Sequence, residues 1–91
     1  MNVIQTIANE MYQRCQKIPS WTKHNFTRDL ELVLQRQDRN RWRLAMRRIN
    51  KTPSDVEVAI IRQAFEVPDS TEATTVEKNG QIIIEMVWET Q

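Results

Sequence analysis

The dipeptide Asn79-Gly80 is the feature that most restricts how this chain can fold. It separates two segments, 73–78 and 81–88, that are rich in Thr, Val and Ile. Asn-Gly between such segments is typical of a β-hairpin closed by a two-residue type I′ turn, in which both turn residues need positive φ angles. The sequence therefore predicts a C-terminal β-hairpin with strands over about 73–78 and 81–88.

The register of this hairpin divides its second strand into two faces. If Lys78 lies opposite Gln81, successive residues of the strand point to opposite sides. One side is expected to pack on the rest of the protein, and it carries Ile82, Ile84, Met86 and Trp88. The other side carries Ile83 and Val87, which we predict to form an apolar contact surface for a second protein chain.

Most of the remaining apolar residues recur at spacings of three and four, which is typical of amphipathic helices. They predict helices over about 2–16, 27–37, 40–50 and 53–66, with 21–26 as a connector. The last helix follows Thr52-Pro53-Ser54-Asp55, a typical helix start. Whether 27–37 and 40–50 form two helices or one bent helix stays open. The expected fold is one α+β domain, mostly helical, with three or four helices followed by the hairpin.

The composition excludes several kinds of site. The one Gly cannot build a phosphate-binding loop or a dinucleotide fingerprint, because both need at least two glycines. One His and one Cys cannot supply a recurring zinc site. The three serines lack the setting of a nucleophile elbow. We therefore expect a protein that is not an enzyme, with no catalytic residues, no cofactor and no metal site.

The cysteine count and the first residues bear on the compartment. Cys15 is the sole cysteine, so this chain cannot form an internal disulfide. The first residues show neither a basic start nor the apolar run of a secretory signal. The longest wholly apolar runs elsewhere are far too short to cross a bilayer. We expect a cytoplasmic protein that does not enter a membrane.

Charge is distributed unevenly along the chain. The overall formal charge is +1, but residues 22–51 hold nine basic and three acidic side chains, whereas residues 52–91 hold two basic and eight acidic ones. Most of the basic residues are arginines, whose guanidinium groups pair well with carboxylate and phosphate. Wound as a helix, residues 39–51 would display them in rows beside an apolar stripe. The candidate contacts for a partner are Arg36, Arg39, Arg41, Arg43, Arg47, Arg48 and Lys51.

These observations predict a small, non-enzymatic protein-interaction or regulatory module. A protein with an acidic surface would bind the arginine-rich helix face, and a homodimer through the apolar hairpin face is the simplest form of association. The alternative is a nucleic-acid-binding protein that contacts phosphates through the helix over Arg39–Lys51. A structural explanation also remains open, in which the arginines pair with acidic residues of the same chain.

Overall fold

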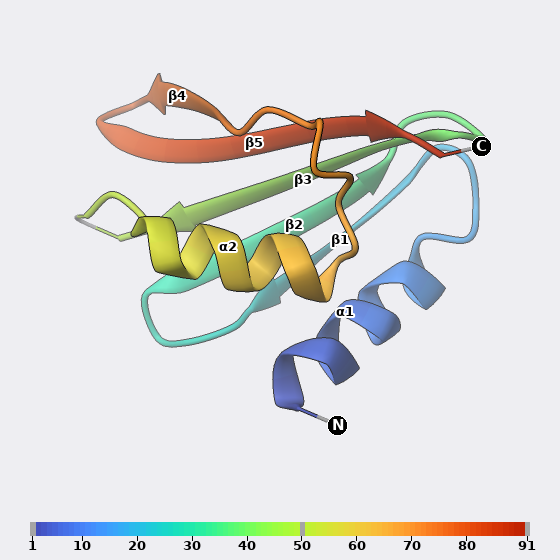
Figure 1. The fold of residues 1–91 in the computed structure, drawn as a ribbon, viewed down its shortest axis with the longest axis horizontal. Helices are drawn as coiled ribbons and strands as arrows, with labels where there is room; N and C mark the ends of the chain where they lie inside the picture. Colours follow the sequence, from blue (N-terminus) through green and yellow to red (C-terminus); the bar gives the residue numbers. More distant parts are fainter. Residues whose placement is uncertain (1, 50, 91) are drawn as a thin grey trace.

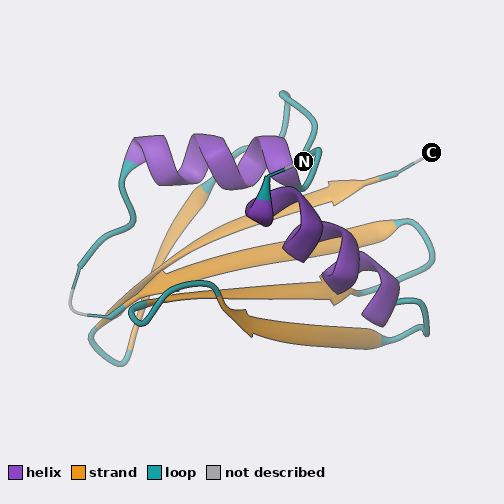
Figure 2. Cartoon of the chain, turned by 90° about the horizontal axis from the view of Figure 1, so that it is seen from below, coloured by secondary structure: helices purple, strands orange, loops and turns teal. Residues whose placement is uncertain are grey.

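A computed structural model describes residues 2–49 and 51–90. All strands found in these residues belong to one antiparallel sheet of order β1-β2-β3-β5-β4, and both helices lie on the same side of it (Figures 1 and 2). The elements follow one another as α1 (Val3–Arg14), β1 (Ser20–Asn25), β2 (Leu30–Arg36), β3 (Arg41–Arg48), α2 (Asp55–Ala64), β4 (Thr74–Lys78) and β5 (Gln81–Glu89).

The expectation of a mostly helical fold is wrong. Segments 27–37 and 40–50, predicted as helices, contain the strands β2 and β3, and the expected connector 21–26 contains β1. Their inward-facing positions recur every second residue, because one face of each strand packs against the helices. In β2 these positions are Leu30, Leu32 and Leu34, and in β3 the buried Leu44 and Met46 follow the partly buried Trp42. The described residues thus form two helices and five strands.

The C-terminal hairpin and the two remaining helices lie where the sequence predicts them. Asn79 and Gly80 have φ angles of 52° and 75°, the positive values that a type I′ turn requires, and Lys78 lies opposite Gln81. The helix expected over 53–66 is α2, which begins with a capping box between Ser54 and Glu57. The helix expected over 2–16 is α1, whose first turn is capped by the Asn2 side chain.

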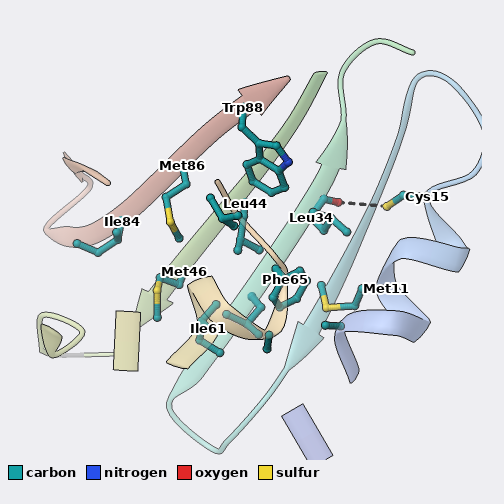
Figure 3. Packing of buried hydrophobic residues seen from close by; sticks show 14 of the residues in the cluster. Met11, Cys15, Leu34, Leu44, Met46, Ile61, Phe65, Ile84, Met86 and Trp88 are labelled. Carbon is teal, nitrogen blue, oxygen red and sulfur yellow. Dashed lines mark hydrogen bonds between the residues drawn. The ribbon is translucent and has the colours of Figure 1, made fainter. Parts of the chain in front are cut away.

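The core lies between the sheet and the two helices (Figure 3). The helices contribute few fully buried side chains, among them Met11 and Ile61, the residues just after them contribute Cys15 and Phe65, and the sheet contributes most of the others. Fully shielded sheet residues are Leu32, Leu34, Leu44, Met46 and Met86. The side chains on the other face of the same strands have no helix over them (Figure 2).

Two polar side chains at this core donate hydrogen bonds to backbone carbonyl groups. The Cys15 thiol donates a hydrogen bond to the carbonyl oxygen of Leu34 over 3.4 Å, and burial raises its pKa (Figure 3). The hydroxyl of Tyr12 donates to the carbonyl oxygen of Phe65 over 2.6 Å, and burial raises the pKa of Tyr12 above its usual range. The Tyr12 ring meets that of Trp42 edge to face, with centroids 4.9 Å apart.

Neither helix among the described residues combines the length and the apolar character that crossing a membrane requires.

Candidate functional site: the open face of the sheet

The face of the sheet that points away from α1 and α2 is the open face. It consists of side chains that alternate with the buried ones along each strand. Its charged members are Lys23 on β1, Glu31 on β2, Arg41, Arg43 and Arg47 on β3, Lys78 on β4, and Glu85 and Glu89 on β5. Its apolar members are Trp21 on β1, Val33 on β2, Ala45 on β3, Val76 on β4, and Ile83 and Val87 on β5.

A chain of polar contacts crosses four strands at one end of the open face. Arg47 donates from Nη2 to Oε1 of Glu31 over 2.6 Å and from Nη1 to Oε1 of Gln81 over 2.8 Å. The second carboxylate oxygen of Glu31 lies 3.5 Å from Nζ of Lys23. Arg47 and Glu31 are directly opposite in the β2–β3 register, so this contact follows from the antiparallel pairing itself.

Two further ion pairs join β3 to β5. Arg43 donates to Glu85, and both side chains are largely shielded, with 25% and 27% of their surface exposed. Arg41 Nη2 lies 3.0 Å from Glu89 Oε1, but there more than half of each side chain is exposed. Arg43 and Glu85 are diagonal neighbours in the sheet, whereas Arg41 and Glu89 are directly opposite. The acidic C-terminal strand therefore neutralises much of the basic strand beside it.

A shallow hollow of about 130 Å³ lies between these ion pairs. Ala45 forms its floor and is only 6% exposed, because the longer side chains around it close over it. Val33 and Ile83 line its walls together with the stems of Arg43 and Arg47. The centre of the open face is thus apolar, and its charges surround that centre.

The structure brings together five of the nine residues predicted to bind a partner. Ile83 and Val87 lie on the open face, as the hairpin register predicts, and Val87 is 47% exposed. Three of the arginines lie on the same face, namely Arg41, Arg43 and Arg47. The other four, Arg36, Arg39, Arg48 and Lys51, lie elsewhere.

Arg48 and Arg36 point to the helix side of the sheet. Arg48 donates from Nη1 to Glu57 of α2 over 2.9 Å, and its Nε lies 3.3 Å from Asp29. A hydrogen bond from Thr27 and the charge of Arg48 lower the pKa of Asp29. Arg36 donates to the carbonyl oxygens of Gln16 and Arg39, 2.8 and 3.1 Å away. Both arginines therefore tie parts of the chain together.

Arg39 lies in the turn between β2 and β3, and Lys51 lies between β3 and α2. No ion pair of either side chain is found within residues 2–49 and 51–90. The predicted helix over 39–51 is wrong, so its rows of arginines do not exist. Arg41 and Arg48 are seven residues apart and would share one side of a helix, but they lie on opposite faces of β3, because seven residues along a strand change the face.

The carboxylates that complete the open face, above all Glu31 and Glu85, are not among the residues predicted from the sequence. A signal was present in β2, where Leu30, Leu32 and Leu34 alternate with other residues, of which Glu31 is one. That period of two indicates a strand and would have placed Glu31 on the outer face. No local signal connects Arg43 to Glu85, because the two residues are 42 positions apart.

Residues 2–49 and 51–90 contain no group of three His, Cys, Asp or Glu side chains arranged to hold a metal ion. Comparisons of the chain with protein-family models, with curated proteins and with solved structures find no significant match.

Proposed function

We propose that this protein is a small, non-enzymatic, cytoplasmic interaction module that self-associates through the open face of its sheet. The observation that carries the proposal is the position of both helices on one side of the sheet (Figure 2), which leaves apolar side chains of β1, β2, β4 and β5 partly exposed on the other. Trp21 at 64% exposure and Val87 at 47% are the most exposed of them. The buried, unpaired Cys15 suits a reducing compartment.

The arrangement of charge favours a second copy of the chain as the occupant. A strongly acidic partner would have to compete with Glu31 and Glu85, which already accept from Arg47 and Arg43. A second copy brings guanidinium and carboxylate groups in equal measure, so that each ion pair can be extended across a two-fold axis. In such a contact the apolar centres around Ala45 would face each other.

The size of the open face fits this occupant. Five strands about 4.8 Å apart and about 20 Å long give a flat area of roughly 500 Å². This is less than the roughly 800 Å² that each partner of a standard interface contributes, as expected for a reversible monomer–dimer equilibrium. The exposed part of Ile83 would contribute up to about 2 kcal/mol when covered.

Sedimentation equilibrium over a wide range of protein concentration tests the proposal. We expect a monomer–dimer equilibrium for the unchanged chain. Ile83→Glu should weaken the dimer at least thirtyfold, or by about 2 kcal/mol, because it places a carboxylate in the apolar centre. Ile60→Glu is the matched control, because Ile60 is an exposed isoleucine of α2 on the helix side of the molecule.

Circular dichroism and urea titration should show that both variants keep the fold. A chain that stays monomeric at every concentration would contradict the proposal. Equal loss of association in Ile60→Glu would contradict it as well, because the open face would then not be the contact.

An acidic protein and a nucleic acid remain predicted partners of the arginines. Of the predicted arginines, Arg41, Arg43, Arg47 and Arg48 contact carboxylates of the same chain, so the electrostatic support for such partners is reduced. Salt separates these partners from self-association. Binding to phosphates weakens steeply as salt rises, whereas an apolar contact between two copies depends on salt much less.

A further inference from the structure

β5 is longer than the strand that covers its edge. It runs from Gln81 to Glu89, but its pairing with β4 ends where Thr74 lies opposite Glu85. The connection from α2 to β4 passes beside the last part of β5 and leaves the line of the sheet (Figure 1). The residues from Met86 to Glu89 therefore have a paired strand, β3, on one side only.

The backbone groups at this edge point toward the missing neighbour. The N–H of Thr90 donates to the carbonyl oxygen of Asn40 over 2.7 Å, which shows that Thr90 directs its backbone groups to the β3 side. Successive residues of a strand direct these groups to alternate sides. Val87 and Glu89 therefore point their N–H and C=O groups away from β3, along the line in which β4 would continue.

A hollow of about 870 Å³ adjoins this edge. Its volume lies within the range of roughly 300–1,000 Å³ that ligand sites occupy. Residues from the end of β5 line one side, and residues from the α2–β4 connection line the other. Arg62 holds that connection in place by donating to the carbonyl oxygens of Pro68 and Thr71, 3.2 and 2.7 Å away. The far wall of the hollow is thus fixed by hydrogen bonds.

The charged groups that line the hollow are mostly acidic. Glu66, Glu72 and Glu89 are carboxylates, and the one cation in the lining, Arg41, is paired with Glu89. Glu66 also has a φ of 54°, the left-handed conformation that glycine or asparagine usually takes after a helix. Glu66 therefore stands at a position where the backbone of a glutamate is strained.

We propose that this edge binds an extended peptide segment with basic side chains, which adds as a short antiparallel strand beside Val87 and Glu89. The segment would continue the line of β4 and exchange backbone hydrogen bonds with these two residues. Its basic side chains would lie near Glu66 and Glu72. Backbone hydrogen bonds would position the segment along the edge. The carboxylates of Glu66 and Glu72 would favour a basic segment over an acidic one.

Fluorescence anisotropy with a labelled acetyl-Lys-Val-Lys-Val-Lys-amide peptide tests this site. The full chain is used at concentrations at which sedimentation shows a monomer, so the result does not depend on self-association. We expect saturable binding that weakens with salt. A counterpart with Glu in place of Lys should bind at least about tenfold more weakly, because its carboxylates would face Glu66 and Glu72.

Two N-methylated forms of the peptide test strand addition directly. One carries N-methyl groups on the first set of alternate amides, and the other carries them on the second set. Only one set points toward β5, so only one form should lose binding, by about tenfold or more. Equal effects of the two forms would overturn the proposal.

Protein variants locate the binding site. Glu72→Gln and Glu66→Asn should each weaken binding about two- to fivefold, as expected for one exposed charge. Glu66→Asn should keep or raise stability, because asparagine tolerates the left-handed conformation. Asp69→Asn is the matched control, since Asp69 lies in the same connection but outside this lining. Unchanged binding in Glu72→Gln and Glu66→Asn, or equal loss in Asp69→Asn, would overturn the assignment.

Discussion

The two faces of the sheet are made by the same strands, yet they are held in different ways. On the covered face Leu32, Leu44 and Met86 are fully shielded beneath the helices. On the open face ion pairs such as Arg43–Glu85 surround the small apolar centre at Ala45. The comparison shows that neighbouring residues of one strand can serve stability and surface recognition separately.

The largest difference between the faces should appear when apolar side chains are truncated. Leu44→Ala on the covered face should lower the free energy of unfolding by about 2–5 kcal/mol, because it leaves a cavity in a closed core. Val33→Ala, measured on the monomer, should cost only about 1 kcal/mol, because solvent already reaches this half-buried side chain. Urea titration measures both values. Equal losses would break the comparison.

Removing an ion pair should also lower the free energy of unfolding more on the covered face than on the open face, but the difference should be smaller than for the apolar truncations. Arg48→Ala should cost about 1–3 kcal/mol, because Glu57 on α2 is only 23% exposed and would keep its charge without this partner. Arg41→Ala on the open face should cost less than about 1 kcal/mol, since Arg41 and Glu89 are well exposed. Thermal unfolding at matched salt compares the two variants. A larger loss for Arg41→Ala would contradict the assignment of the faces.

A pH-dependent effect is expected at Tyr12, which lies on the helix side. Its pKa is raised in the folded protein by burial and by Glu66, so the folded state holds the phenol proton more tightly than the unfolded state does. The stability due to this difference is complete below about pH 10, the ordinary pKa of tyrosine, and falls as the pH rises above it. Tyr12→Phe should remove this pH dependence at a cost of about 1 kcal/mol at neutral pH.

Ultraviolet absorbance provides a direct measurement, because Tyr12 is the only tyrosine in the chain. We expect phenolate to form only together with unfolding. Ionisation near pH 10 while the fold persists would show that the hydroxyl is open to water.

Local rules predict part of this fold. The Asn79-Gly80 turn depends on two residues with positive φ, and α2 depends on the cap at Ser54, so both could be found in short windows of sequence. The strands β2 and β3 were hidden by Val33 and Ala45. These apolar residues of the open face complete a spacing of three and four with their buried neighbours and imitate a helix.

The candidate site was less predictable than the fold. Ile83 and Val87 could be placed on one face from the hairpin register alone. The partners of Arg43 and Arg47 could not be identified, because Glu85 and Glu31 reach them only through the order of strands in the sheet. The residue types indicate where basic side chains are concentrated. The order of strands in the sheet determines which of these side chains are paired with carboxylates.

The buried thiol of Cys15 can report how α1 moves relative to the sheet. It lies after the end of α1 and is fully shielded against the sheet, with its hydrogen bond directed to β2. A reagent in solution can reach it only when α1 lifts away. The rate at which this single cysteine is alkylated therefore measures how often α1 separates from the sheet.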